Sequence, residues 1–166
     1  MITLKKAQTA DIDIALSLIR QGQQHLKAQG IDQWQNGYPD RTRLEQDIQE
    51  QAGYLVMDDS EVLGYLCIIL TGEPAYDRIE GHWLTEGRYA VVHRIVLSDH
   101  ARGHGLSTAV FSLIDNFCKK QNIPALRIDT HADNRKMQHV LSKCGFTFCG
   151  IVTYTSGLRR AYEKLL

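Results

Sequence analysis

The chain has no excess of charge of either sign: its 166 residues include 19 Lys and Arg and 19 Asp and Glu. Proteins that bind nucleic acid or lie on a membrane surface usually carry a basic excess, so this balance argues against both kinds of partner. Long apolar runs are also lacking. The longest, Val62 to Leu70, is too short to span a bilayer and has the length of a buried strand. The first residues lack the layout of a signal peptide, so we expect a cytoplasmic protein.

Metal-binding and redox patterns are missing too. The 4 cysteines form no Cys-x-x-Cys pair, and no His-Glu-x-x-His motif occurs among the 7 histidines. In a chain of this length without a secretion signal, such cysteines are typical of reduced, buried thiols. We therefore expect no catalytic metal and no disulfide framework.

Proline is scarce, at 3 residues, and the chain has no repeat, low-complexity stretch or linker. A length of 166 residues favours one domain, which we place over residues 1–166.

Apolar periodicity predicts seven strands and four helices in the order β-α-α-β-β-β-α-β-α-β-β. We expect strands at Ile2–Ala7, Gly53–Asp59, Glu61–Thr71, Ala90–Leu97, Ala125–Thr130, Phe146–Thr155 and Leu158–Leu165. Helices are expected up to Ala28, over Arg41–Gln51, from Leu106, and after Asp133 as its N-cap, with Gly145 as the stop of the last one. The segment EPAYDRIEGHW reads as a polar loop. This order predicts an α/β (α+β) fold: a mixed, mostly antiparallel sheet flanked by helices.

A glycine-rich turn, SDHARGHGLST from Ser98 to Thr108, lies between an expected strand and an expected helix. Glycines permit positive φ and close approach to a ligand, and the first N–H groups of a helix have no partner inside it. With Arg102 nearby, these features suit a phosphate or pyrophosphate. The alternative is a turn in which the glycines serve geometry alone. A P-loop would need to end in Gly-Lys-Ser/Thr, and a dinucleotide-binding turn would need a third glycine. The turn has neither the Gly-Lys-Ser/Thr sequence nor the third glycine.

At this turn the sequence resembles the GNAT superfamily of acyl-CoA-dependent N-acetyltransferases. Their signature, Gln/Arg-x-x-Gly-x-Gly/Ala, reads here Arg102-Gly103-His104-Gly105-Leu106-Ser107, with serine in the final place. The stretch DTHADNRKMQHVLSKCGF, Asp129 to Phe146, is similar to a second family segment, and the element order matches along nearly the whole chain.

The resemblance implies acetyl-CoA as co-substrate and a GNAT-like fold. The pyrophosphate would lie on the turn, against Arg102, Gly103, His104, Gly105, Leu106, Ser107 and Thr108. The strand edge at Ile95, Val96 and Leu97 would pair with the pantetheine arm, and Asn134 would reach the pantetheine or the phosphates. The thioester would enter between this strand and Ala125–Thr130. Lys136 is a candidate for the 3′-phosphate, or else an exposed charge at a helix start.

Many family members carry a carboxylate base at the position of His93. A histidine can accept a proton at neutral pH, so His93 is the candidate catalytic base, the alternative being a structural histidine beside the sheet. The family's usual tyrosine acid is replaced by Leu141, which leaves Tyr154, Ser142 or water to protonate the thiolate.

Aromatic residues in two polar loops, Trp34, Tyr38 and Tyr76, are candidates for the acceptor site or for packing of loop against core. The expected reaction is acetyl transfer from acetyl-CoA to a primary amine of a small molecule or peptide, by direct attack in a ternary complex. A non-catalytic acyl-CoA-binding or sensing domain is the alternative. The last two strands can pair in a homodimer, because sheet edges are often covered.

Overall fold

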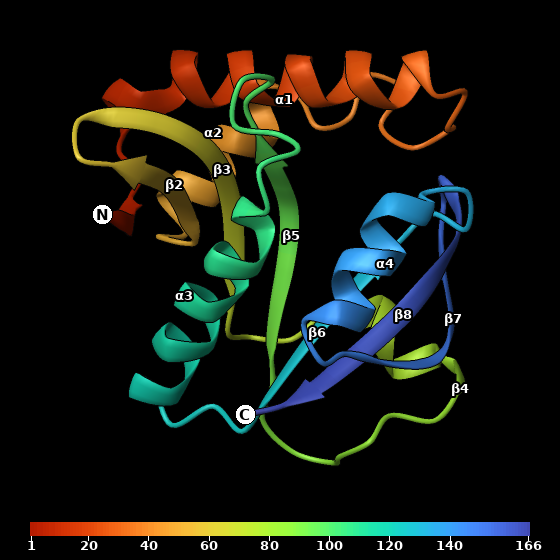
Figure 1. The fold of residues 1–166 in the computed structure, drawn as a ribbon. Helices are drawn as coiled ribbons and strands as arrows, with labels where there is room; N and C mark the ends of the chain where they lie inside the picture. The colour runs from red at the N-terminus through yellow and green to blue at the C-terminus, as the bar shows by residue number, and fades with distance from the viewer. The chain divides into compact units, whose positions relative to one another are not determined.

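The computed structural model describes residues 1–166. Its contacts divide the chain into two compact units: one of residues 1–68 and 93–110, the other of residues 69–92 and 111–166. The hydrogen-bonded strand order is β1-β2-β3-β5-β6-β8-β7-β4 (Figure 1). Strand β5 (Ala90–Leu97) and helix α3 (Leu106–Lys120) each contribute residues to both units.

The first unit contains three antiparallel strands and two helices. These are β1 (Ile2–Lys6), a 3-10 turn η1 (Thr9–Asp11), α1 (Ile12–Ala28), α2 (Arg41–Gln49), β2 (Gly53–Asp58) and β3 (Glu61–Ile69). The apolar face of α1 supplies Ala15, Leu18 and Ile19 to a core that also contains Tyr65 and Val96. The apolar periodicity of α1 therefore correctly predicts its buried face.

The second unit contains four further strands, one helix and a 3-10 turn. The strands are β4 (Glu80–Gly81), β6 (Ala125–Thr130), β7 (Thr147–Tyr154) and β8 (Gly157–Leu165), the helix is α4 (Arg135–Lys143), and the 3-10 turn is η2 (Pro74–Arg78). Strand β8 is antiparallel to both β6 and β7, and β4 is antiparallel to β7. The start of β5 is parallel to β6, at Ala90↔Leu126 and Val91↔Arg127. The predicted class, a mixed and mostly antiparallel sheet with helices, is confirmed.

Three local expectations need correction. Helix α4 is capped by Asn134, whose side chain accepts a hydrogen bond from the N–H of Met137, and not by Asp133. The segment EPAYDRIEGHW, expected to be a loop, contains η2 and β4. Strand β4 has two residues, which is too short for an alternation of apolar and polar residues to be seen in the sequence. Of the four free cysteines, Cys67 and Cys118 are buried as expected, whereas Cys144 and Cys149 are only partly buried.

None of the helices has the length and apolar character needed to cross a membrane. No group of three or more His, Cys, Asp or Glu side chains is arranged to hold a metal ion.

Candidate active site

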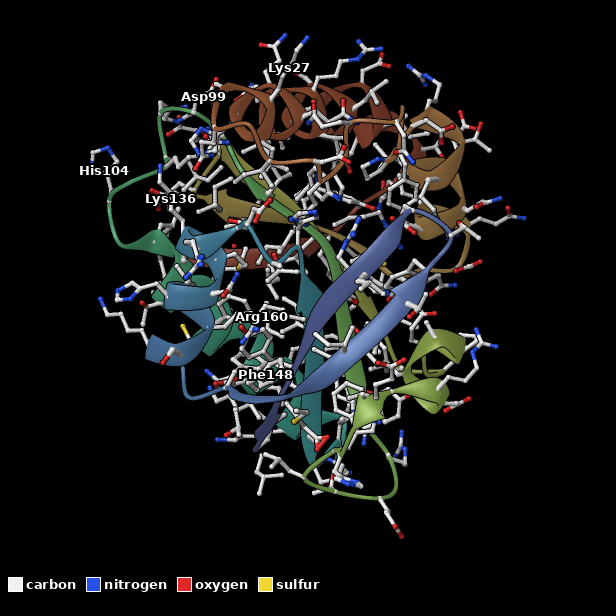
Figure 2. All side chains as sticks on the ribbon, turned by 90° about the vertical axis from the view of Figure 1, so that its right-hand side faces the viewer. Lys27, Asp99, His104, Lys136, Phe148 and Arg160 are labelled. Carbon is white, nitrogen blue, oxygen red and sulfur yellow. The ribbon has the colours of Figure 1, made fainter.

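The glycine-rich turn has the geometry that its sequence suggests. Gly103 and Gly105 have φ of +84° and +70°, and a Cβ added at either would meet no atom within 4 Å. The backbone hydrogen bonds of the turn are donated by Ala101 and Arg102, and none by residues 103–107. Because the first N–H groups of α3 also have no acceptor within the helix, the turn offers several free donors. His104 extends from it into solvent (Figure 2).

The first part of the turn, directly after β5, is held in place by side-chain hydrogen bonds and an ion pair. Arg102 contacts the carboxylate of Asp99 at 2.5 Å and donates to the carbonyl of Leu97 at 3.0 Å. Gln21 of α1 accepts from the N–H of Asp99 at 2.9 Å. The guanidinium of Arg102 is thus occupied within the turn, where it fixes the backbone; its role as a phosphate ligand stays a prediction.

The other two expected cofactor residues lie on or beside α4, in the second unit. Asn134 uses its side-chain oxygen as the N-cap, at 3.2 Å from the N–H of Met137. Lys136 is exposed in the first turn of this helix (Figure 2).

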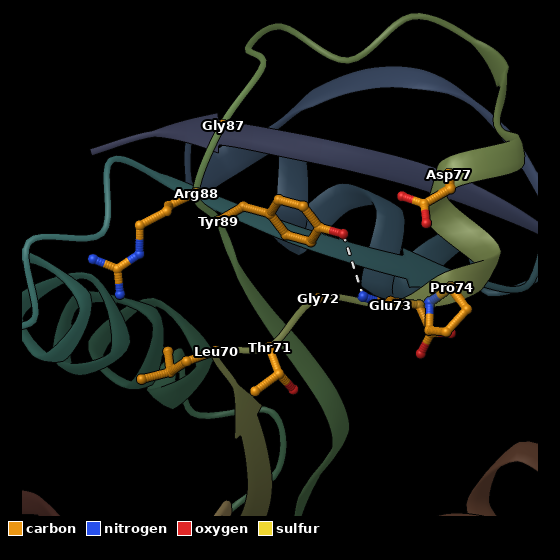
Figure 3. Close-up of a pocket in the computed structure, with 9 residues that line it drawn as sticks. All are labelled: Leu70, Thr71, Gly72, Glu73, Pro74, Asp77, Gly87, Arg88 and Tyr89. Atoms are coloured by element: carbon orange, nitrogen blue, oxygen red, sulfur yellow. Dashed lines mark hydrogen bonds between the residues drawn. The ribbon is translucent and has the colours of Figure 1, made fainter.

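A cavity of about 440 Å³ lies in the second unit (Figure 3). It is lined by Leu70, Thr71, Gly72, Glu73, Pro74, Asp77, Gly87, Arg88 and Tyr89. The hydroxyl of Tyr89 accepts from the N–H of Glu73 at 3.2 Å and closes one side of it.

Tyr76 lies in the same unit and is buried, with 1 % of its surface exposed. Its ring packs in a core cluster against Trp83, with centroids 5.0 Å apart. Its hydroxyl donates to Oδ2 of Asp129 at 2.6 Å, and the hydroxyl of Tyr154 donates to the same oxygen at 2.8 Å. Of the two alternatives for Tyr76, packing is therefore observed, together with a polar contact that the sequence did not suggest.

The loop before β5 is held by a buried cation. Arg127 pairs with Glu163 at 2.7 Å and donates to the carbonyl of Thr85 at 2.8 Å. Its guanidinium lies between the rings of Trp83 and Tyr89, at 4.2 and 3.8 Å from their centroids. These contacts fix the loop that lines one side of the cavity.

Within the first unit, β5 alternates between two environments. His93, Ile95 and Leu97 are half-buried, whereas the intervening Arg94 and Val96 are buried. Arg94 has a φ of +54°, which interrupts the regular strand next to His93.

Glycines let neighbouring elements come close to β5. A Cβ at Gly64 of β3 would lie 2.5 Å from the carbonyl oxygen of Val96, and one at Gly22 of α1 would lie 2.7 Å from its side chain. The expected pantetheine-binding edge is thereby held between a strand and a helix that approach without side chains.

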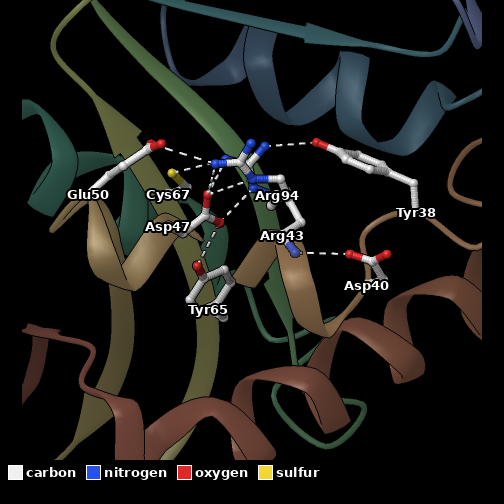
Figure 4. A network of polar contacts seen from close by, with 8 residues as sticks. All are labelled: Tyr38, Asp40, Arg43, Asp47, Glu50, Tyr65, Cys67 and Arg94. Atoms are coloured by element: carbon white, nitrogen blue, oxygen red, sulfur yellow. Dashed lines mark hydrogen bonds and ion pairs between the residues drawn. The ribbon is translucent and has the colours of Figure 1, made fainter. Parts of the chain in front are cut away.

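A buried ionic network surrounds Arg94 (Figure 4). Its guanidinium makes two bonds to Asp47 of α2, at 2.6 and 2.7 Å. Asp47 also accepts from the hydroxyl of Tyr65 at 2.8 Å and from Arg43 at 3.1 Å. Burial and the nearby Asp47 raise the pKa of Tyr65, which keeps this phenol a donor.

The network reaches one of the candidate acceptor residues. Arg94 donates to the hydroxyl of Tyr38 at 2.8 Å, and Tyr38 is 42 % exposed. Trp34 lies in the same loop with a φ of +63° and packs on the core of the first unit. It also lines a cavity of about 270 Å³ together with Arg20, Gln23, Gln24, Lys27, Gln35 and Gly37.

Five charged residues that form the polar contacts above were not predicted from the sequence: Asp47, Arg94, Arg127, Asp129 and Glu163. A signal was present for several of them, because Arg94 and Arg127 stand inside apolar, β-branched strands and Asp47 follows Leu44 on the buried side of α2. A charge at such a position is rare unless it is paired.

The family model of the acetyltransferase (GNAT) family matches residues 19–146. A GNAT-family acetyltransferase from Streptococcus agalactiae is 34% identical, with a TM-score of 0.90 over 99% of this chain and 95% of that one. A second, from Listeria monocytogenes, is 21% identical, with a TM-score of 0.79 and 99% and 95% covered. Aminoglycoside acetyltransferase AAC(6')-Ib in complex with coenzyme A and kanamycin is 16% identical, with a TM-score of 0.73 and 99% and 95% covered. The last two show likeness of fold alone. No curated relative matches the chain.

Proposed function

From the premise that the chain belongs to the acetyltransferase (GNAT) family, we propose that it moves the acetyl group of acetyl-CoA to a primary amine of a small molecule or peptide. The transfer takes place by direct attack of the amine within a ternary complex. The similar fold of an aminoglycoside acetyltransferase with bound coenzyme A supports the choice of co-substrate.

The observation that carries the proposal is the turn from Ser98 to Ser107. Two glycines with positive φ leave open space above a run of N–H groups without backbone acceptors. A pyrophosphate bound there accepts hydrogen bonds from these groups and lies at the positive end of α3. The residues we assign to this contact are Arg102, Gly103, His104, Gly105, Leu106, Ser107 and Thr108.

The pantetheine arm is assigned to the edge of β5. An extended amide chain can pair with Ile95, Val96 and Leu97 as an added strand. Gly22 and Gly64 support this edge from behind, since both lie close to Val96. Contacts of the coenzyme with Asn134 and Lys136 stay predictions from the family resemblance.

For the chemical step, the amine must be neutral when its nitrogen attacks the thioester carbonyl, and its proton must leave as the C–N bond forms. We assign the acceptance of this proton, directly or through a water, to His93. The half-buried position of His93 beside the irregular residue Arg94 supports this role.

The departing thiolate needs a proton, for which the sequence offers Tyr154, Ser142 or water. Leu141, at the family's usual acid position, is buried and has no proton to give. The hydroxyl of Tyr154 already donates to Asp129, and burial and that carboxylate raise its pKa. Ser142, exposed on α4, and water remain, and we assign protonation of the thiolate to water. The acceptor amine, the range of acyl groups, the cytoplasmic location and a homodimer stay predictions.

The proposal is tested by incubating the protein with acetyl-CoA and a panel of primary amines and detecting the released thiol, with mass spectrometry of the products. Wild type should acetylate at least one amine, and His93→Ala should bind acetyl-CoA normally but turn over slowly. Binding of acetyl-CoA without turnover of any amine would favour the acyl-CoA-sensing alternative, and absence of binding would refute both.

A further inference from the structure

A carboxylate in the second unit is held by two tyrosines and keeps one oxygen open. Asp129 lies on β6, Tyr76 on η2 and Tyr154 at the end of β7. Both hydroxyls donate to Oδ2, at 2.6 and 2.8 Å. Oδ1 of Asp129 accepts no hydrogen bond. The one buried side-chain polar atom without a hydrogen-bond partner is Oδ1 of Asp115, so Oδ1 of Asp129 is not fully buried. It therefore remains accessible.

The two phenols stay protonated, so the cluster carries one negative charge. Burial is the largest cause that raises the pKa of Tyr76 and of Tyr154 far above the ordinary value, and the charge of Asp129 is the second. Because each phenol has one proton and directs it to Oδ2, neither neutralises the carboxylate. No Lys, Arg or His forms an ion pair with Asp129: Arg127 is engaged by Glu163, and Arg160 lies over the ring of Phe148 at 4.0 Å (Figure 2).

A second carboxylate acts on the same tyrosines. Glu73 is the N-cap of η2, the turn that carries Tyr76, and its charge contributes to the raised pKa of both Tyr76 and Tyr154. Glu73 also lines the cavity of about 440 Å³, together with Asp77. The cation in that lining, Arg88, extends toward the opposite side of the cavity from both acids (Figure 3). Two further acids of the second unit, Glu73 and Asp77, thus lie on η2 or directly before it.

The two phenol bonds connect β6, η2 and β7 through Oδ2 of Asp129. They leave Oδ1 open, and they leave the charge of this half-buried carboxylate without a cation from the protein. A protonated amine supplies both the missing donor and the missing positive charge.

We propose that Oδ1 of Asp129, fixed in place by Tyr76 and Tyr154, binds a protonated amine of the acceptor. This proposal rests on the proposed acetyl transfer and adds the substrate class. The acceptor carries a second, cationic amine besides the neutral one that is acetylated. Diamines and larger polyamino compounds fit this description, whereas acceptors with an acidic group at that position do not.

The test uses three acceptors that differ in one end group: 1,4-diaminobutane, 4-aminobutan-1-ol and 4-aminobutanoate. Their second ends are cationic, neutral and anionic at neutral pH. Wild type should show the highest kcat/KM with the diamine and the lowest with the acid. Loss of one charged hydrogen bond corresponds to roughly a 10- to 100-fold change, so a diamine preference of that order over the alcohol is expected.

Variants then connect the preference to the cluster. Asp129→Asn keeps the shape and removes the charge, and should abolish the preference for the diamine over the alcohol. Tyr154→Phe should retain it, because the carboxylate and Oδ1 remain. Glu80→Gln, an equal loss of charge at an exposed position of β4, is the matched control and should behave as wild type.

Calorimetric titration with acetyl-CoA distinguishes failure of the Asp129 proposal from failure of the proposed acetyl transfer. If wild type binds acetyl-CoA but prefers the alcohol or the acid, the Asp129 proposal is wrong and the acetyl transfer stands. An unchanged preference in Asp129→Asn has the same meaning. If wild type binds acetyl-CoA and acetylates none of the three amines, the Asp129 proposal is wrong, and the wider amine panel decides on the acetyl transfer. If wild type does not bind acetyl-CoA, the proposed function fails, and the inference fails with it. The comparison of the three acceptors needs wild type alone, so it decides even if Asp129→Asn does not fold.

Discussion

Replacing Asp47 with Asn should destabilise the protein strongly, although Asp47 lies on a helix whose surface is mostly polar. The side chain of Asp47 is fully buried and that of Arg94 is 5% exposed, at 2.6 Å from each other. Removing one charge of such a pair leaves the other buried and uncompensated, which costs about 3–5 kcal/mol. For a chain of this size, each kcal/mol lowers Tm by about 2–4 °C, so a fall of roughly 6–20 °C is expected.

A matched control lies on the same helix. Glu45 pairs with Arg41 at 3.9 Å with both side chains half exposed, and such pairs contribute about 0.3–0.5 kcal/mol. Thermal unfolding followed by circular dichroism should therefore show a shift of at most about 2 °C for Glu45→Gln. The double variant Asp47→Leu/Arg94→Met should recover part of the stability, because it removes both charges of the pair, while the buried hydroxyl of Tyr65 loses its acceptor. Equal Tm shifts for Asp47→Asn and Glu45→Gln would refute the reasoning.

Four further outcomes are expected. His93→Ala should lower kcat about 100-fold or more and remove the acidic limb of the pH–rate profile, and an unchanged profile would exclude His93 as the base. Burial raises the pKa of the thiols of Cys67 and of Cys118 to about 12, so neither should react with a disulfide reagent at neutral pH until the protein is unfolded. Because the folded state then holds protons that the unfolded chain releases above its ordinary pKa of 9.0, the free energy of unfolding should fall as the pH rises from 9 to about 12, and a constant value in denaturant titrations would contradict this. Arg102→Ala should loosen the turn and weaken acetyl-CoA binding about tenfold in calorimetry, and an unchanged Kd would show that the bond to Asp99 has no part in it.

The strands that position the site were predictable from the sequence. Ala90–Leu97 and Ala125–Thr130 are found as expected, because both are apolar, rich in branched side chains and bounded by residues that end strands. The turn at Gly103 and Gly105 was predictable for a similar reason, since both positions require a conformation that glycine adopts without strain.

The predictions that the structure corrects depend on contacts between residues far apart in the sequence, or on which of two adjacent residues acts as a cap. Strand β4 exists only as a partner of β7, at Glu80↔Ile151, and two residues have no pattern to detect. Asp133 and Asn134 are both good N-caps, and local sequence alone does not choose between them.

The polar clusters were not predictable from local patterns. Asp47 and Arg94 are 47 residues apart, and Tyr76 and Asp129 are 53 apart, so each pairing appears only when the fold brings the elements together. The periodicity of a strand tells that a charged residue is buried but not which partner it meets. Predictions of residue roles from the family signature thus locate a turn and a strand, while the groups that hold them in place come from the structure.

The central claim, that acetyl-CoA binds on the Gly103–Gly105 turn, is tested most directly by calorimetric titration of acetyl-CoA into wild type, Gly105→Glu and Gly30→Glu. Gly105 and Gly30 have the same φ of +70° and the same open space around an added Cβ, so backbone strain and loss of glycine are matched. We predict binding to wild type and to Gly30→Glu, and its loss in Gly105→Glu, whose carboxylate occupies and repels the pyrophosphate site. Equal binding by all three proteins would contradict the claim, as would absence of binding to wild type.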